Sequence, residues 1–129
     1  MGAPNIKDSG TRQTYDSGAN RDNATGKGRM DLLPPEAILR VSRWYEVGAN
    51  KYGDHNWQKG MPISRYLDAG LRHLFKYLAG CDDEDHLSAV VWNVLAVMHH
   101  EEHDPHLQDV LAWKGKVSSY RYELDYGEK

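Results

Sequence analysis

The sequence lacks several features that would point to a particular class of protein. Its 129 residues include one cysteine, Cys81, so no disulfide can form within the chain and a reducing compartment is expected. The opening MGAPNIKDSG has no apolar core of a secretory signal, and no apolar run is long enough to span a bilayer. With 16 Lys and Arg against 19 Asp and Glu, the net charge is −3, without the basic excess of a nucleic-acid-binding protein. We expect one cytoplasmic domain, with neither a membrane nor a nucleic acid as a direct partner.

Familiar phosphate-binding and hydrolase motifs are also missing. There is no G-x-x-x-x-G-K-[ST] phosphate loop, no G-x-S-x-G, no cysteine-based zinc motif and no internal repeat. Residues 1–28 have almost no apolar side chains, and this composition predicts a solvated, disordered arm. Within the arm, however, Arg21 and Lys27 stand among small residues, and backbone amides beside a cation suit a phosphate. The alternative is therefore an arm that orders over a nucleotide.

Residues 29–104 have the apolar pattern of a helical core. The segments expected to be helical are residues 36–48, 65–78 and 87–98. In the second segment four leucines at i, i+4, i+7 and i+11 keep to one face, and Gly80 is suited to end the helix. The third segment is apolar on every side except at Ser88 and Asn93, so it must be covered on every side. We therefore expect a small all-α bundle completed by further copies of the chain, as a dimer or tetramer.

The first expected helix is followed by a loop that could contact a ligand. Pro35 suits the first helical turn, Ile38, Val41 and Tyr45 mark the expected buried face, and the helix is expected to end near Gly48. Residues 48–60 are then expected to form a loop. Its lysines and aromatic side chains could meet a phosphate and a base, or the loop could be a plain connection with its aromatics packed on the core.

Two acidic side chains of the core stand beside apolar or basic neighbours. Glu46 lies at the flank of the apolar side of the first helix, where a carboxylate needs a cation or hydrogen-bond donors. Asp68 shares a helix face with Arg65 and Arg72. That face is either a solvated ion-pair ladder or the polar rim of a phosphate–metal pocket.

The acidic turn at residues 81–85 leads into the third helix. Asp85 suits the N-cap, but with its acidic neighbours and His86 it could also hold a divalent cation. His73 points away from Asp68 and is expected to face another helix or a second subunit. The histidines and acids of residues 99–104 have the composition of a metal site, but the favoured interpretation is the solvated end of the third helix.

Short motifs follow one another along the chain. They are Ser17-Gly18-Ala19 with Arg21-Asp22, Gly26-Lys27-Gly28-Arg29, Asp31-Leu32-Leu33-Pro34-Pro35-Glu36, Gly48-Ala49 with Lys51-Tyr52-Gly53, Asn56-Trp57 with Lys59-Gly60, Asp68 with Arg72-His73-Leu74, and Asp83-Glu84-Asp85-His86-Leu87 with Trp92-Asn93. This ordered set, over residues 15–101, resembles the bacteriophage dATP/dGTP diphosphohydrolases, the MazZ-type family. The resemblance implies an all-α enzyme related to the MazG-like nucleotide pyrophosphatases. It implies metal-dependent hydrolysis of dGTP or dATP to the monophosphate and pyrophosphate, with Mg, Mn or Co, and a role in supplying dGMP for 2-aminoadenine DNA.

The MazG metal ligands do not transfer to this chain. MazG enzymes carry an E-E-x-x-E helix, which is absent here, and a later E-x-x-D helix, which only Glu101 and Asp104 match. Ligands are instead chosen from charge and position. The expected catalytic and metal-binding carboxylates are Glu46, Asp68 and Asp85, with His73 and His86 as further metal ligands. The expected substrate contacts are Lys51, Arg65 and Arg72, with Arg21 and Lys27 from the arm, for phosphate, and Asn56 and Trp57 for the base.

Two alternative functions and one segment remain open. An HD-type phosphohydrolase would use His73, Asp85 and His86, although this adjacent pair has the reversed order Asp-His, and only His103-Asp104, at the expected end of the third helix, has the required order. A helical dimer that binds a nucleotide without turnover is the other alternative. Residues 105–129 are expected to be a C-terminal extension, with a short helix over residues 106–113.

Overall fold

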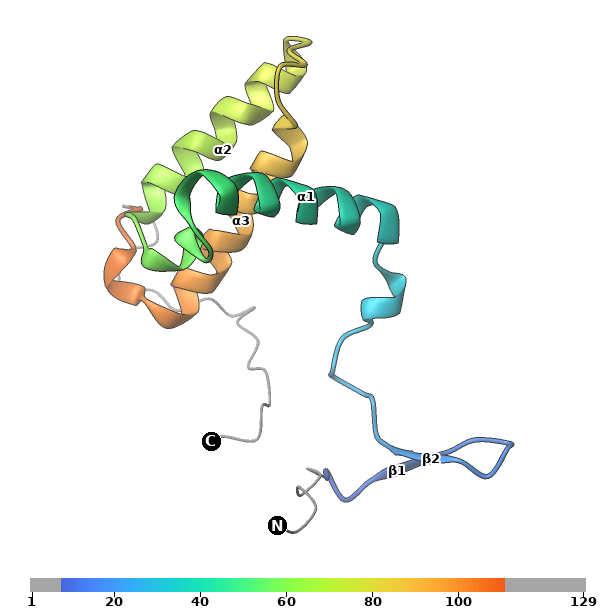
Figure 1. Ribbon diagram of the computed structural model, residues 1–129. Helices are drawn as coiled ribbons and strands as arrows, with labels where there is room; N and C mark the ends of the chain where they lie inside the picture. The colour runs from blue at the N-terminus through green and yellow to red at the C-terminus, as the bar shows by residue number, and fades with distance from the viewer. Residues whose placement is uncertain (1–7, 111–129) are drawn as a thin grey trace. The chain divides into compact units, whose positions relative to one another are not determined.

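The computed structural model describes residues 8–110, which fall into two compact units divided between Leu33 and Pro34. The first unit contains an antiparallel hairpin of β1 (Arg12–Thr14) and β2 (Asn20–Asp22), in which Gln13 pairs with Arg21 (Figure 1). A short 3-10 helix, η1 (Met30–Leu32), follows.

The hairpin differs from the disordered arm that composition predicted. Local polar contacts hold it, because the Asp22 carboxylate accepts hydrogen bonds from the Ser9 amide at 3.0 Å and from the Lys27 ammonium at 3.4 Å. The Tyr15 amide also donates to the Ala19 carbonyl at 2.9 Å across the turn. A composition without apolar residues therefore does not prevent a short hairpin when side chains can bond to the backbone.

The second unit is helical, as expected. Its elements are α1 (Pro35–Tyr52), η2 (Asn56–Lys59), α2 (Ile63–Leu78), α3 (His86–His103) and η3 (Pro105–Leu107). Helices α2 and α3 lie side by side as an antiparallel pair, and α1 crosses them with most of its contacts on α3 (Figure 1). None of the helices within residues 8–110 has the length and apolar character needed to cross a bilayer.

Helix α1 continues beyond its expected end. It runs through Gly48 to Tyr52 and is capped by Gly53, whose φ of 91° is positive. One glycine inside a helix costs only about 1 kcal/mol relative to alanine, so the helix can continue where it packs against α3. Lys51 and Tyr52 are therefore helical residues, and the expectation of a loop starting at residue 48 was wrong. The expected stop at Gly80 is confirmed, because the amides of Gly80 and Cys81 bond to the carbonyls of Tyr77 and Lys76.

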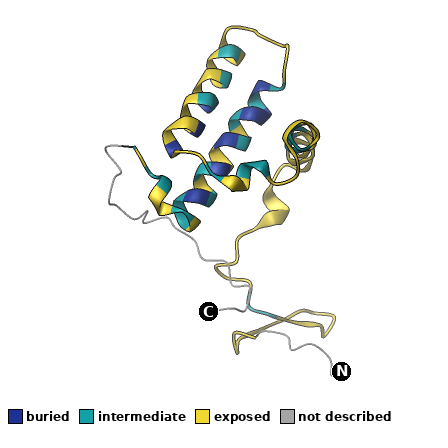
Figure 2. Cartoon of the chain, turned by 60° about the vertical axis from the view of Figure 1, so that its left-hand side comes forward, coloured by how far each residue is buried: buried dark blue, intermediate teal, exposed yellow. Residues whose placement is uncertain are grey.

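The buried residues of α2 and α3 lie where the two helices face each other (Figure 2). The buried residues of the two helices are Ile63, Tyr66 and Gly70 on α2, and His86, Ser88, Ala89, Asn93, Ala96 and His100 on α3. At Gly70 an added Cβ would lie 3.3 Å from the Cβ of Asn93, so the absence of a side chain allows the two helices to approach closely.

Ile63 and Tyr66 are the large side chains buried in this contact, whereas several other large apolar side chains of the two helices are exposed. Leu71 of the leucine stripe is 56% exposed, and Met98 of α3 is 61% exposed. Ile38, expected on a buried face, is also exposed, whereas Val41 and Tyr45 are partly buried. The chain therefore presents apolar helix faces that its own described residues do not cover.

The expected helix over residues 106–113 is wrong in its described part. The 3-10 helix η3 ends at Leu107, and residues 108–110 are not helical. Residues 111–129, the greater part of the expected C-terminal extension, lie outside the described residues.

Candidate functional site

Two hollows lie on either side of the C-terminal half of α1. One has a volume of about 500 Å³ and the other about 360 Å³. Both are lined by Gly48, Tyr52, Asn56 and Trp92, so the two hollows adjoin. Their volumes fall within the range of small-molecule sites. We call the larger one the rim pocket. We call the smaller one the cation pocket, after the Lys51 and Arg65 side chains that line it.

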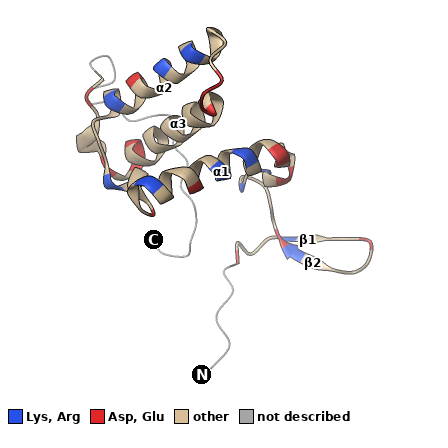
Figure 3. Ribbon diagram, turned by 45° about the horizontal axis from the view of Figure 1, so that its top comes forward, with Lys and Arg blue, Asp and Glu red and all other residues tan. Residues whose placement is uncertain are grey.

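The cation pocket brings together residues from all three helices. Lys51 enters it from α1, Arg65 and His73 from α2, and Glu84 from the turn before α3. Asn56 of η2 lies at the junction with the rim pocket. The basic positions along α2 and the acidic turn that follows it are seen in Figure 3. Four expected site residues, Lys51, Asn56, Arg65 and His73, therefore line one cavity, beside a carboxylate that was not selected from the sequence.

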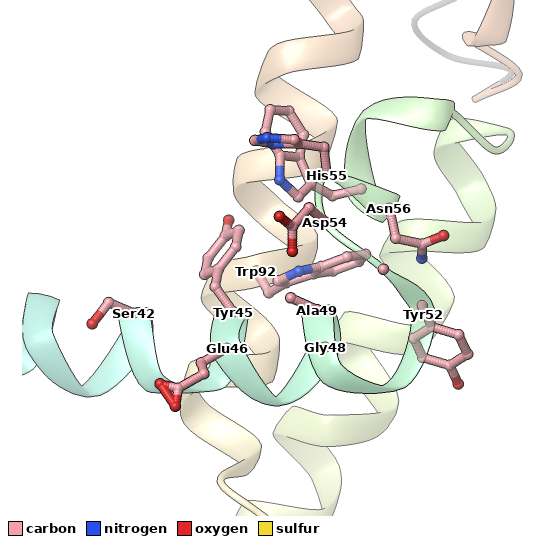
Figure 4. Close-up of a pocket in the computed structure, with 12 residues that line it drawn as sticks. Ser42, Tyr45, Glu46, Gly48, Ala49, Tyr52, Asp54, His55, Asn56 and Trp92 are labelled. Atoms are coloured by element: carbon pink, nitrogen blue, oxygen red, sulfur yellow. The ribbon is translucent and has the colours of Figure 1, made fainter.

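The rim pocket contains the remaining residues expected on this side of the molecule. Glu46, Asn56 and Trp57 line it, together with Asp54 and Trp92. In Figure 4 Glu46 lies well apart from Asp54, and it is exposed to solvent. The energetic cost of a buried carboxylate, from which a site at Glu46 was inferred, is therefore absent.

An imidazole pair joins the end of α2 to the start of α3. The Nδ1 atoms of His73 and His86 are 2.9 Å apart, and His86 is only 2% exposed. The other ring nitrogen of His86, Nε2, donates to the Asp83 carboxylate at 2.8 Å. The Glu84 carboxylate lies 3.9 Å from Nδ1 of His73. Burial lowers the pKa of His73, which favours the neutral imidazole that metal ions require.

Asp68 is engaged by arginines. Its carboxylate accepts from Arg65 at 2.9 Å and is also bonded to Arg72. All three side chains are more than half exposed, and neither Asp68 nor Arg72 lines the two pockets on α1. The geometry is that of the solvated ion-pair ladder, in which Asp68 orients Arg65 beside the cation pocket.

Asp85 caps α3 and binds an arginine of α1. Both of its oxygens accept from the Arg40 guanidinium, at 2.7 and 2.8 Å, and the Ser88 amide donates to it at 3.2 Å. The Arg40 hydrogen bonds hold the pKa of Asp85 well below its usual range, and the Ser88 hydroxyl adds to this effect. The N-cap interpretation of Asp85 is confirmed.

His100 corrects the expected solvated end of α3, because its ring is fully buried. Its Nδ1 lies 2.7 Å from the Asp104 carboxylate, and its Nε2 lies 2.8 Å from the Trp57 carbonyl and 3.2 Å from the Tyr66 hydroxyl. The Tyr66 hydroxyl donates to the same carbonyl at 3.1 Å. This His100 clamp ties η2, and with it Asn56 and Trp57, to α2 and α3.

Arg21 and Lys27 belong to the first unit. Both line a hollow of about 800 Å³ on the hairpin, together with Arg12, Asp8 and Asp22. Lys27 forms an ion pair with Asp22. The two basic residues expected from the arm thus lie on one local surface.

Sequence reasoning named Asp83 and Glu84 as members of an acidic cluster beside His86 that could hold a divalent cation, but did not select either as a site residue. It also missed Arg40, Tyr66 and the buried role of His100. The sequence positions of His73 and His86 did indicate that the two side chains meet. They stand almost symmetrically about a short turn, and residues so placed face each other in an antiparallel helix pair. That symmetry places Glu84 in the same neighbourhood, since it stands two residues before His86. No comparable signal marks Arg40, whose partner is 45 residues away.

By fold and pocket, the chain is a small all-α protein in which cations and imidazoles line a ligand-sized hollow. It belongs to the family described as dATP/dGTP diphosphohydrolase, N-terminal, whose family model matches residues 17–110. A Salmonella phage PMBT28 protein named dATP/dGTP diphosphohydrolase is 38% identical over 60 residues, which are 46% of this chain and 20% of that protein. The chain thus spans about a fifth of the length of the relative it matches. No solved structure matches it.

Proposed function

We propose that this chain hydrolyses purine deoxynucleoside triphosphates, dGTP and dATP, to the monophosphate and pyrophosphate with the help of a divalent cation. The observation that carries the proposal is the cation pocket, in which Lys51 and Arg65 line the same cavity as His73 and Glu84. The positively charged side chains of Lys51 and Arg65 suit a polyphosphate, and the imidazole of His73 with the carboxylate of Glu84 suits a divalent metal ion. The family and the printed name of the phage relative support this choice of substrate.

In this proposal the triphosphate occupies the cation pocket and the base extends toward the rim pocket. Lys51 and Arg65 bind the outer phosphates, and Asp68 positions Arg65 and Arg72 rather than binding metal. Asn56 stands at the junction of the pockets, where its amide can bond to a purine edge. Trp57 offers a ring for stacking on the base side. Glu46 then faces the donor groups of the purine rather than the reacting phosphorus.

The reaction is attack of a water oxygen on the α-phosphorus, with cleavage of its bond to the oxygen that leaves with pyrophosphate. A bound divalent cation supplies neutralisation of phosphate charge and polarisation of the reacting groups. Lys51 and Arg65 neutralise further negative charge and fix the leaving group. Asp85 holds Arg40 and the first turn of α3, so it supports the position of His86 without touching substrate.

A second copy of the chain is proposed to cover the exposed apolar faces of α2 and α3. Leu71, Leu78 and Met98 are all more than half exposed, and the described residues of the chain do not cover them. Exposed apolar surface of this extent is typical of an interface. We place the assembled enzyme in the cytoplasm of an infected host cell, where its dGMP would feed synthesis of 2-aminoadenine DNA.

The test is a nucleotide panel with product analysis. The full chain is incubated with dGTP, dATP or dCTP and Mg, Mn or Co, and the products are separated by ion-exchange chromatography. The proposal predicts dGMP and pyrophosphate from dGTP, and little reaction with dCTP. Formation of dGDP with phosphate would contradict attack at the α-phosphorus.

Nucleotide binding without turnover is the second candidate function. It is favoured by the short match to the phage relative, because the remaining four-fifths of that protein could carry the chemistry. It is also favoured by Asp68 and Asp85, whose carboxylates are both occupied by arginines. Saturable dGTP binding with no product under any of the three metals would establish it. An HD-type enzyme would instead release inorganic triphosphate, but the ion pair between Asp85 and Arg40 does not favour it.

A further inference from the structure

The imidazole pair at the turn between α2 and α3 has a defined arrangement of protons. A carboxylate only accepts hydrogen bonds, so Nε2 of His86, 2.8 Å from Asp83, carries the proton of a neutral ring. Its Nδ1 then accepts a hydrogen bond across 2.9 Å from Nδ1 of His73, which carries its proton in the metal-free chain and would move it to Nε2 when a cation binds. A carboxylate that orients a histidine through its distal N–H is the usual outer partner of a metal-ligating imidazole.

The spacing of the ligand atoms suits one cation. Two nitrogens that each lie about 2.1 Å from a metal ion, at a right angle, are about 3.0 Å apart, close to the separation of the two Nδ1 atoms. One oxygen of Glu84 lies 3.9 Å from Nδ1 of His73, and all three ligand atoms are within 4.8 Å of one another. Glu84 is on an exposed turn, so its side chain can rotate toward the nitrogens without moving a helix.

Packing holds the rings of His73 and His86 more firmly than it holds the carboxylate of Glu84. His86 is buried between the helices, and His73 lies edge-on to Trp44 with ring centroids 6.3 Å apart. Two ligands are therefore held in place before a cation arrives, which lowers the cost of ordering them. Because Glu84 and His73 both line the cation pocket, a cation held by them would lie beside the cavity that Lys51 and Arg65 also line.

We propose that Nδ1 of His73, Nδ1 of His86 and the carboxylate of Glu84 form a transition-metal site, oriented by Asp83, that prefers Co, Mn or Zn to Mg. Two imidazoles and one carboxylate favour these ions, whereas Mg prefers an all-oxygen shell with several waters. The inference deepens the proposed function, since it names the class of cation and the ligands that the reaction would use. The proposed site excludes Asp68 and Asp85, whose oxygens are held by arginines.

Isothermal titration of the chelator-treated full chain with Co, and separately with Mg, tests the site without nucleotide. We expect one Co per chain, a visible absorption band from nitrogen ligation, and weaker binding of Mg. The conservative variant Asp83→Asn is expected to weaken Co binding about 10- to 100-fold through the orientation of His86. Asp82→Asn is the matched control, since it removes the same charge from the adjacent exposed position, and it should leave Co affinity unchanged.

Two further variants complete the test. Glu84→Gln removes a ligand on the exposed turn and should weaken Co binding, while His86→Gln should abolish the absorption band. Because Asp83 and Glu84 are exposed, their variants should fold even if His86→Gln does not, and circular dichroism checks this. Absence of Co binding, equal affinity for Mg, or equal loss in Asp82→Asn and Asp83→Asn would overturn the inference. Co binding with these dependences in a chain that leaves dGTP intact would reject the proposed hydrolysis while the metal site stands.

Discussion

Replacement of His100 by phenylalanine tests whether the His100 clamp fixes the segment that carries Asn56 and Trp57. The ring is fully buried and has oxygen partners at 2.7 and 2.8 Å, and phenylalanine keeps much of its shape while removing both nitrogens. The Trp57 carbonyl would keep one donor, the Tyr66 hydroxyl at 3.1 Å. Loss of the buried hydrogen bonds should lower the free energy of unfolding by about 1–3 kcal/mol.

Tyr66→Phe sharpens this prediction, because it removes the other donor to the same carbonyl. Alone it should cost about 0.5–1.5 kcal/mol, since Nε2 of His100 still lies 2.8 Å from the Trp57 carbonyl. The double variant leaves the carbonyl without either donor. Its loss of stability should exceed the sum of the two single losses by about 0.5–3 kcal/mol.

Urea denaturation followed by far-ultraviolet circular dichroism gives the four free energies of this cycle. The control is His103→Phe, at an exposed position of the same helix, which should change stability by less than about 0.5 kcal/mol. An equal effect at both histidines, or strict additivity with Tyr66→Phe, would refute the shared-acceptor reasoning.

Three further predictions concern the pocket, pH and assembly. Lys51→Ala and Arg65→Ala should each raise the KM for dGTP about tenfold or more in steady-state assays, because each removes a charged hydrogen bond to phosphate. Asp85→Asn should keep the N-cap of α3 but lose its charged contact with Arg40. Since the pKa of Asp85 is lowered from 3.8 in the folded chain, this contribution is present above that value and is lost as the pH falls through the folded pKa. The difference in unfolding free energy between wild type and Asp85→Asn should therefore shrink on acidification below about pH 4. Leu71→Asp should reduce the mass measured by light scattering to that of a single chain.

Each of these three predictions has its own control. Lys59→Ala removes a lysine that lines neither pocket on α1, and an equal rise in KM there would contradict the assigned role of Lys51. A constant stability difference between wild type and Asp85→Asn down to acid pH would show that the carboxylate is not stabilised by folding. Asn50→Asp, an exposed change on α1, should leave the mass unchanged. If the wild type itself has the mass of a single chain, the proposed assembly is contradicted.

Local sequence signals predicted the helices well because apolar spacing, caps and glycines act over a few residues. The stop at Gly80 and the cap at Asp85 are examples, since both depend on bonds within one turn. The end of α1 was misplaced because Gly48 is a weak breaker when a helix has tertiary support. The true end required Gly53, which has the positive φ.

The site was harder to predict because its contacts join distant parts of the chain. Composition could select His73 and His86 but could not show that their Nδ1 atoms meet. It could not show that Asp85 binds Arg40, or that His100 is buried, because the 3.6-residue pattern describes a helix face but not its partner. The leucine stripe was recognised correctly as one face, yet the residues of α2 that are buried are Ile63, Tyr66 and Gly70, which lie beside it.

Hydrolysis of dGTP in ¹⁸O-labelled water tests the central claim most directly. Water that attacks the α-phosphorus leaves its oxygen on dGMP, so mass spectrometry should find the label in dGMP and none in pyrophosphate. Label in pyrophosphate, release of inorganic triphosphate, or intact dGTP in the presence of each metal would contradict the account.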